Sequence, residues 1–338
     1  MKARVLLAKL LALLLALHAA PALAATVVRL GTIAPDGSVW HDVLLEIAQR
    51  WRELSNGEVE LRIYAGGVLG GEDEMVRKMQ RRGLDALAVS GSGLPRIDPV
   101  VGCLNLPLLF ESYEELEHVR NGIAPRLEAS FEARGYKVLN WAEAGWVHIF
   151  AKSPVRTPDD LRSLRLWTSA GDPGGERLAR ELGFRVVPLP ATDMLTSLQT
   201  GLIEAIDVPP LFALLDRSYQ AAPYMTDLQF APLNAATVIT LPAWERIPAP
   251  LREPLLAAAR EAAVPLRERI HQAEREAVEE MVARGLTVVE LDAAARAAWR
   301  RMADSAYERL DCAREYPQLY ERVLELRREY RSSGGASD

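Results

Sequence analysis

Residues able to do acid–base, nucleophilic or metal chemistry are present, but not at the spacings that such chemistry uses. The sequence contains no His-Glu-x-x-His, no Cys-x-x-Cys and no Gly-x-Ser-x-Gly motif. Beyond residue 24 the histidines are His41, His118, His148 and His271, too scattered for metal-ligand spacing. The sequence leaves open whether the fold brings two distant carboxylates together as a pair. The sequence therefore predicts no cofactor, no metal site and no catalytic residues.

Two other features with chemical potential have plainer interpretations. The glycine-rich stretch 66–71 lacks the Lys and Ser/Thr of a phosphate-binding loop, so its glycines are assigned to turns. Most Asp and Glu alternate with Lys and Arg in helical patterns, which is typical of solvated helix faces. Cys103 and Cys312 could form a disulfide in an oxidising compartment or remain two buried thiols, and the sequence does not decide between them.

The N-terminus predicts export. Lys2, Arg4 and Lys9 precede an apolar run at 10–17, and Ala22-Leu23-Ala24 has the pattern of a cleavage site. The apolar run is shorter than the ~20 residues of a membrane-spanning helix. We expect a signal peptide at 1–24 and a soluble periplasmic protein. Its loss removes three cations and no carboxylate, so the net charge moves from −6 to −9, with both signs well mixed. Nucleic acid, which needs a concentrated basic face, is excluded as a partner.

Strands and helices alternate along the chain. Strands are predicted at 26–32, 59–64 and 84–90, with helices at about 39–55 and from Gly71 to Gly83 between them. This β-α-β-α-β order predicts a mostly parallel sheet with helices on both faces, in which ligands bind at the carboxyl ends of the strands. The predicted fold class is α/β.

The pattern restarts in the second half. Strands are predicted at 146–152, 164–168, 184–188 and 202–208, with helices opening at Pro158 and spanning 174–182 and 191–200. The Ala-, Glu- and Arg-rich segment 250–285 predicts long helices interrupted at Pro265. Further helices are expected from about 292 and about 316, extra C-terminal elements before a disordered tail at 334–338.

An ordered series of motifs resembles a known family. The series is LGTIAPDGSVWHD (30–42), the segment 55–90, LNLPLLFESYEE (104–115), SPVRTPDDLRSLRLW (153–167) and LQTGLIEAIDVPP (198–210). It resembles the DctP-type extracytoplasmic receptors of tripartite ATP-independent periplasmic (TRAP) transporters over residues 26 to about 292. The resemblance implies a two-lobed periplasmic binding protein that closes around a ligand by a hinge motion and works with TRAP membrane subunits.

The resemblance also implies where a ligand carboxylate would be bound, and this chain departs from it there. The family's usual Arg on the strand after the DL-x-x-L helix corresponds to Trp167. A second frequent Arg corresponds to Val147, and a frequent Asn to Val208. All three polar positions are apolar or aromatic here, so this is a variant that lacks the carboxylate-binding Arg.

This substitution changes the expected ligand. A carboxylate removed from water without a partner costs several kcal/mol, and a bidentate Arg is the usual remedy. Burying ~250 Å² of apolar ligand surface would contribute ~6 kcal/mol, most of the ~8 kcal/mol of a micromolar complex before ordering costs. We therefore expect a small, apolar or amphipathic organic ligand, with a quaternary ammonium compound as a less favoured option.

The predicted ligand-binding residues combine these positions with polar and aromatic neighbours. For Trp167 core packing is the alternative role, and for His148 a purely structural hydrogen bond. The full predicted set is Trp40, Ser90, Ser92, Trp146, Val147, His148, Trp167, Val208, Pro209, Phe212 and Asn234.

Two lobes are predicted from discontinuous segments. Lobe I comprises 25–145 and about 233–275, and lobe II comprises about 146–232 and 276–333 with the C-terminal helices. Three alternatives stay open for function: a receptor that reports to a sensor or a helical-repeat periplasmic protein, a carboxylate receptor with a rearranged site, and an enzyme on a binding-protein scaffold.

Overall fold

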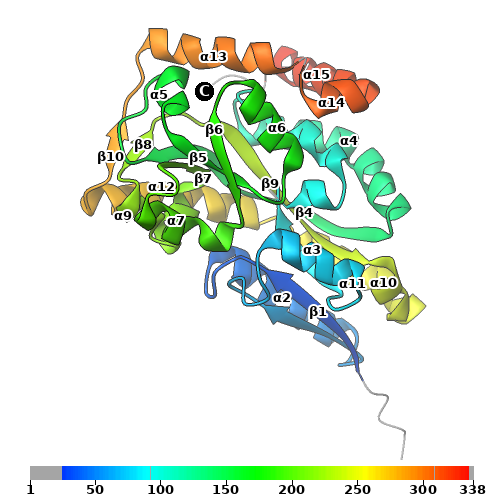
Figure 1. Cartoon of the computed structure of the whole chain (residues 1–338). Coiled ribbons are helices and arrows are strands. Elements are labelled where there is room, and N and C mark those ends of the chain that lie inside the picture. The colour runs from blue at the N-terminus through cyan, green and yellow to red at the C-terminus, as the bar shows by residue number, and fades with distance from the viewer. Residues whose placement is uncertain (1–24, 92, 308, 335–338) are drawn as a thin grey trace, which may run out of the picture.

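The computed structural model describes residues 25–91, 93–307 and 309–334 (Figure 1). The predicted signal peptide at 1–24, Ser92 and residues 335–338 of the predicted tail lie outside the described residues.

The first sheet is built as the β-α-β pattern predicts. Strands β1 (Thr26–Thr32), β2 (Val59–Tyr64) and β3 (Ala86–Ser90) are parallel and lie in the order β2-β1-β3. Strand β9 (Ala231–Thr240) then pairs antiparallel with β3, and the first part of β4 (Tyr136–Ala151) pairs antiparallel with β9. A segment distant in sequence therefore completes this sheet.

The second sheet begins at the C-terminal end of β4. The last residues of β4 pair antiparallel with β7 (Ala205–Val208) and β8 (Tyr224–Thr226). Strand β5 (Arg165–Ser169) is parallel to β7 and to β6 (Arg185–Leu189), and β10 (Thr287–Val289) is parallel to β8. The predicted strand 146–152 is thus the second part of a longer strand that belongs to both sheets.

A bulge separates the two parts of β4. Its pairing with β9 shifts register between Glu143 and Gly145, and Gly145 has φ +126°. A Cβ at Gly145 would lie 2.1 Å from a carboxylate oxygen of Glu274 and 2.8 Å from Cβ of Pro209. Only glycine combines this backbone conformation with this close approach, so the crossing between the sheets is built around Gly145.

Helices cover both faces of the first sheet. On one face lie α2 (Val39–Leu54), α10 (Leu241–Arg246) and α11 (Ala249–Ala263), packed around Trp51, whose indole N–H donates to the Leu255 carbonyl at 2.9 Å. On the other lie α3 (Glu72–Gln80), α4 (Tyr113–Ala133) and the 3-10 turns η1 (Leu94–Arg96) and η2 (Pro99–Leu104).

The second sheet is covered in the same way. Helices α5 (Pro158–Arg162), α6 (Pro173–Glu181) and α13 (Ala293–Tyr307) lie on one face. The turn η3 (Ala191–Asp193) and helices α7 (Met194–Thr200), α8 (Pro210–Leu215) and α9 (Ser218–Ala221) lie on the other. Helix α12 (Leu266–Ala283) contacts both α2 and α8 and so links the two halves; the predicted interruption at Pro265 is confirmed.

The C-terminal helices return to the first half of the chain. Helix α14 (Asp311–Glu315) and helix α15 (Pro317–Ser332) share a core with α4, and Cys312 forms a disulfide with Cys103. Figure 1 shows α13 and α15 one after the other along the end of the molecule opposite β1. The lobe boundaries given above stay a prediction.

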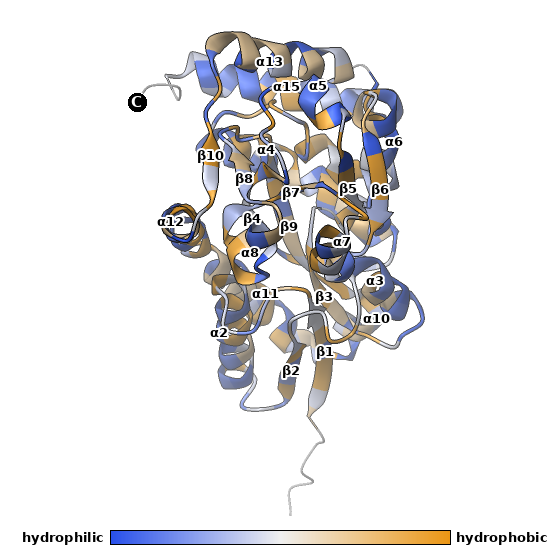
Figure 2. Cartoon of the chain, turned by 60° about the vertical axis from the view of Figure 1, so that its left-hand side comes forward, coloured by the Kyte–Doolittle hydropathy of each residue, from blue (hydrophilic) through white to orange (hydrophobic). Residues whose placement is uncertain are grey.

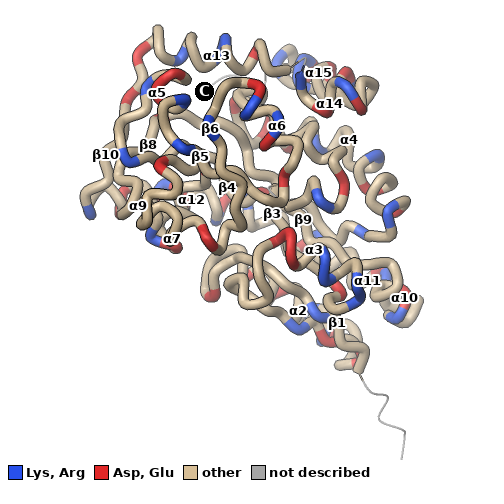
Figure 3. Tube along the Cα trace, viewed as in Figure 1, with Lys and Arg blue, Asp and Glu red and all other residues tan. Residues whose placement is uncertain are grey.

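Hydrophobic residues gather in the central strands, and charged residues of both signs lie on the helices. Figure 2 shows largely hydrophobic central strands, and Figure 3 shows acidic and basic residues interspersed over the helices. Within the described residues, no helix has both the length and the apolar character needed to cross a membrane.

Candidate ligand-binding cleft

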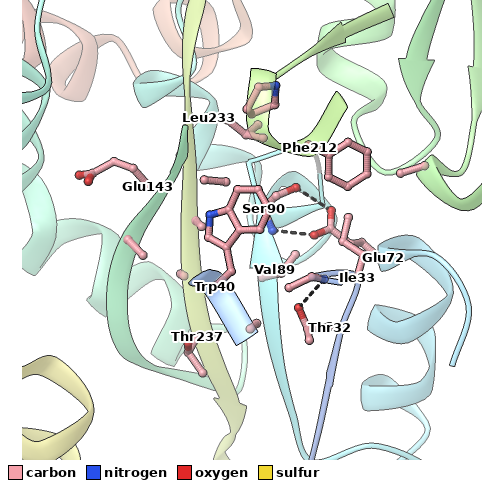
Figure 4. Close-up of a pocket in the computed structure, with 18 of the residues that line it drawn as sticks. Thr32, Ile33, Trp40, Glu72, Val89, Ser90, Glu143, Phe212, Leu233 and Thr237 are labelled. Carbon is pink, nitrogen blue, oxygen red and sulfur yellow. Dashed lines mark hydrogen bonds between the residues drawn. The ribbon is translucent and has the colours of Figure 1, made fainter. Parts of the chain in front are cut away.

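A cavity of ≈ 130 Å³ lies where the two sheets meet. Its walls come from the ends of β1 and β3, from α2 and the β4–β9 crossing, and from β5, β7 and α8 of the second sheet. Figure 4 shows the Trp40 ring among these elements, with Phe212 and Leu233 nearby. The apolar lining includes Ile33, Trp40, Val89, Trp167, Met194, Val208, Phe212 and Leu233.

A second cavity of ≈ 180 Å³ adjoins it beneath α6. Trp167, Asp207 and Leu233 line both cavities, so they form the wall between them. The second cavity is bounded mainly by apolar side chains, among them Val147, Ile149, Leu166, Phe184 and Phe230, together with Asp172. The cleft is therefore larger than either cavity alone.

Three carboxylates line the first cavity, and two of them are engaged by protein groups. Glu72, at the start of α3, accepts hydrogen bonds from the Ser90 backbone N–H at 2.6 Å and from the Ser90 hydroxyl at 2.9 Å (Figure 4). Glu143 forms ion pairs with Arg120 and, at 3.5 Å, with Arg267. Figure 4 shows its carboxylate directed away from Trp40.

Asp207 is the third carboxylate, and its environment is different. Among the described residues, its own backbone N–H is the one hydrogen-bond donor to its carboxyl group. Burial, together with the nearby charge of Asp172, raises the pKa of Asp207 to about 7. The pKa of Asp172 is also raised by burial, although its side chain accepts from the Gly175 N–H at 2.9 Å as the cap of α6.

The three positions at which the resemblance implies polar residues lie along the cleft. Trp167 is only 6% exposed and its indole N–H donates to the Leu189 carbonyl at 3.0 Å, so it is both part of the core and part of the cavity wall. Val208 lines the first cavity and Val147 the second. No Lys, Arg or His of the described residues lines either cavity.

The remaining predicted residues divide into two groups. Trp40, Ser90, Pro209 and Phe212 line the first cavity. Trp146, His148 and Asn234 line neither, and Ser92 lies outside the described residues.

Trp146, His148 and Asn234 each have a structural role. Trp146 is 2% exposed and packs edge-on against Tyr113. The His148 Nδ1 donates to the Thr226 carbonyl at 3.3 Å, and burial lowers its pKa. The Asn234 amide donates to the Leu104 carbonyl and to the Asn105 side chain, both at 3.1 Å. Strand alternation explains the split at 146–147, because adjacent residues face opposite sides of β4.

Sequence reasoning did not single out the carboxylates of the cleft. Glu72 falls at the start of the helix predicted from Gly71 to Gly83, and Asp207 stands in IEAIDVPP beside the selected Val208. Its position at the end of a buried strand was the available signal. Within the described residues, no group of three or more His, Cys, Asp or Glu side chains could hold a metal ion.

Two half-molecules joined by crossing strands, with a mainly apolar cavity between them, define the class of two-lobed solute-binding receptors. The chain belongs to the family described as bacterial extracellular solute-binding protein, family 7 (DctP), which it matches over residues 30–311. It is a TRAP-type periplasmic solute receptor, and its family binds small organic ligands for TRAP membrane subunits. The expected two-lobed α/β fold is confirmed.

Relatives and solved structures agree on this assignment. The chain is 24% identical over 277 residues to the 2,3-diketo-L-gulonate-binding periplasmic protein of Escherichia coli, covering 81% of this chain and 84% of that protein. It is 26% identical over 271 residues to the C4-dicarboxylate-binding periplasmic protein of Rhodobacter capsulatus, covering 78% and 79%.

A TRAP solute-binding protein from Desulfovibrio salexigens with bound orotic acid superposes with a TM-score of 0.83 at 22% identity, covering 91% of this chain and 99% of that one. A sugar-acid-binding protein from Advenella mimigardefordensis in complex with galactonate gives 0.84 at 19% identity, covering 90% and 98%.

Proposed function

We propose that this receptor captures a small, apolar or amphipathic organic ligand in the cleft and delivers it to the membrane subunits of a TRAP transporter. The observation that carries the proposal is the composition of the cavity walls. They contain Trp167, Val147 and Val208 where a carboxylate clamp is expected, and no basic side chain among the described residues.

An acidic ligand meets two obstacles in such a cleft. It finds no guanidinium or ammonium group to replace the water it loses. It also faces Asp207, and two ionised carboxylates ~5 Å apart repel each other by ~3 kcal/mol at an effective dielectric constant of ~20. The relatives named above are described with acidic ligands, so the proposal separates this chain from them in ligand class while keeping the receptor function.

An apolar surface has no such difficulty here. The rings of Trp40 and Phe212 and the side chains of Val89, Met194 and Val208 offer a wall that excludes water. At about 25 cal/mol per Å², burial of ~250 Å² of ligand surface contributes ~6 kcal/mol before ordering costs. Micromolar affinity therefore requires few polar contacts.

Native mass spectrometry of the exported protein tests the proposal, followed by solvent extraction and identification of the molecule that co-purifies. A lipid, an aromatic compound or another largely apolar molecule is the expected result. A small carboxylate would overturn the proposed ligand class and support the alternative of a carboxylate receptor with a rearranged site.

If the protein purifies without a ligand, a thermal-shift screen of matched apolar and acidic compounds distinguishes the two ligand classes. A ligand that binds only the folded state raises the melting temperature.

A further inference from the structure

Most polar side chains that line the cleft are held by hydrogen bonds or ion pairs to other protein groups. Glu72 and Glu143 are engaged by Ser90 and by Arg120 with Arg267, as described above. Asn140 is engaged as well, because its amide donates to the Ala259 carbonyl at 3.0 Å and its oxygen accepts from the Thr237 N–H at 3.3 Å. Asp207 is left as a carboxyl in the wall between the two cavities.

In the part of the chain that the structure describes, no basic side chain lines the cavities on either side of Asp207. The ionisable group that acts on Asp207 is Asp172 at the start of α6, and the other ionisable side chains that line the cavities are Glu72 at the start of α3 and Glu143 on β4. All are acids. Among the described residues, Glu143 pairs with Arg120 and Arg267, and the charge of Arg177 acts on Asp172, but none of these arginines lines either cavity. An isolated carboxyl in an apolar wall is costly to ionise unless a cation arrives.

Aromatic side chains also line the first cavity. Aromatic faces of Trp40, Trp167 and Phe212 contribute to the lining. Such faces attract cations at short range, most strongly when both are removed from water.

We infer that the ligand of this cleft is an organic amine, whose protonated nitrogen binds Asp207 and whose apolar body fills the cavities on either side of Trp167. The inference rests on the proposed function and narrows its ligand class from amphipathic molecules in general to amphipathic cations. The ammonium N–H groups donate to the Asp207 carboxylate, and the hydrocarbon chain contacts the apolar wall.

Matched six-carbon probes test the inference: n-hexylamine, 1-hexanol and hexanoate, titrated calorimetrically into the exported protein at about pH 8 and about pH 5. Hexylammonium should bind at least tenfold more tightly than hexanol at the higher pH. Its affinity should fall at least tenfold at the lower pH, where a carboxyl with a pKa of about 7 is protonated. The amine itself stays protonated throughout this range.

Asp207→Asn should remove both the preference for the amine and its pH dependence while leaving hexanol binding unchanged. Asp216→Asn is the matched control. Asp216 is a second carboxyl whose pKa is raised by burial, to about 6, but it lines neither cavity. This variant should bind hexylammonium like the unchanged protein. Circular dichroism establishes that both variants are folded.

Three results would overturn the inference. Equal binding of hexanol and hexylammonium, unaffected by Asp207→Asn, would refute the amine and leave the proposed apolar cleft intact. Absence of hexylammonium binding up to about 1 mM, a weak affinity for such a site, would also refute it. Tightest binding of hexanoate, strengthening as the pH falls, would show a protonated Asp207 donating to an acid and would refute the proposed ligand class as well.

Discussion

Tyr113 on α4 donates a 2.7 Å hydrogen bond to Glu274 on α12, beside the bulge where β4 crosses between the sheets. The same carboxylate accepts from the Trp146 backbone N–H at 3.1 Å. Burial raises the pKa of Glu274 to about 7 and, with the nearby Glu274 charge, also raises that of the Tyr113 hydroxyl. A single carboxyl thus connects the linking helix, a helix of the first half and the strand shared by both sheets.

Glu274 should make stability depend on pH in a defined direction. Its pKa of about 7 in the folded state exceeds the 4.5 of a free Glu, so the folded protein holds the proton over a range in which the unfolded chain releases it. The free energy of unfolding should therefore fall as the pH rises from about 4.5 to about 7, by at most ~1.4 kcal/mol per pH unit.

Urea titrations across this range would measure the effect. Glu274→Gln should flatten the slope, and Glu279→Gln, an exposed position of the same helix, should not. Identical slopes for the two variants would show that Glu274 does not hold the proton.

The disulfide between Cys103 and Cys312 should contribute strongly to stability. It joins η2 to the start of α14 across a sequence separation of 209 residues, and so restricts the unfolded chain over most of its length. Replacing both cysteines by serine should lower the free energy of unfolding by about 2–5 kcal/mol. Thermal unfolding with and without a reducing agent checks this: the reductant should destabilise the unchanged protein and have no effect on the double variant.

Much of the fold could be predicted because local patterns agree with it. The run TVVRLGT forms β1, and the acidic-to-basic order of EDEMVRK coincides with α3. The break at Pro265 separates α11 from α12. Each of these features is determined by residues close together in the chain, so it can be predicted from a single sequence.

The site was less predictable because its residues are selected by pairing between distant segments. Only the register of β4 against β9, with its shift near Gly145, decides that Val147 reaches a cavity while Trp146 packs on Tyr113. Asn234 was expected in the cleft, yet its side-chain amide donates a hydrogen bond to the Leu104 carbonyl. The role proposed for Asp207 depends on the lack of a basic side chain among the described residues of the cavity walls, a property of the folded chain that no sequence spacing reveals.

Trp167→Ala should weaken binding of the co-purifying ligand at least tenfold, because it opens the wall between the cavities. Since Trp167 is only 6% exposed, the same change should also cost about 3–5 kcal/mol of stability. Trp167→Phe is the milder test: it keeps an aromatic face and loses the bond to Leu189, worth about 0.5–1.5 kcal/mol.

Trp299→Phe is the matched control for the indole, since Trp299 is fully buried, donates its N–H to the Arg156 carbonyl at 2.9 Å and lines neither cavity. Calorimetric titration should find its affinity unchanged. A similar loss of affinity in both Phe variants would mean that Trp167 acts through general stability.

The ion pair between Arg120 and Glu143 should matter more for stability than the ion pairs of the surface. Both side chains are buried, at 6% and 3% exposure, and Glu143 forms part of the cavity wall while Arg120 does not. Arg120→Met should cost about 3–5 kcal/mol, because it leaves a buried carboxylate with only the longer contact to Arg267. Adding Glu143→Gln should restore much of that loss by removing the uncompensated charge.

Arg62→Gln, which breaks the exposed pair with Glu60, is the control and should cost no more than ~1 kcal/mol. Urea unfolding of the four proteins measures these differences, and a double variant no more stable than Arg120→Met alone would show that packing of the Arg120 side chain, and not the charge of Glu143, sets the cost.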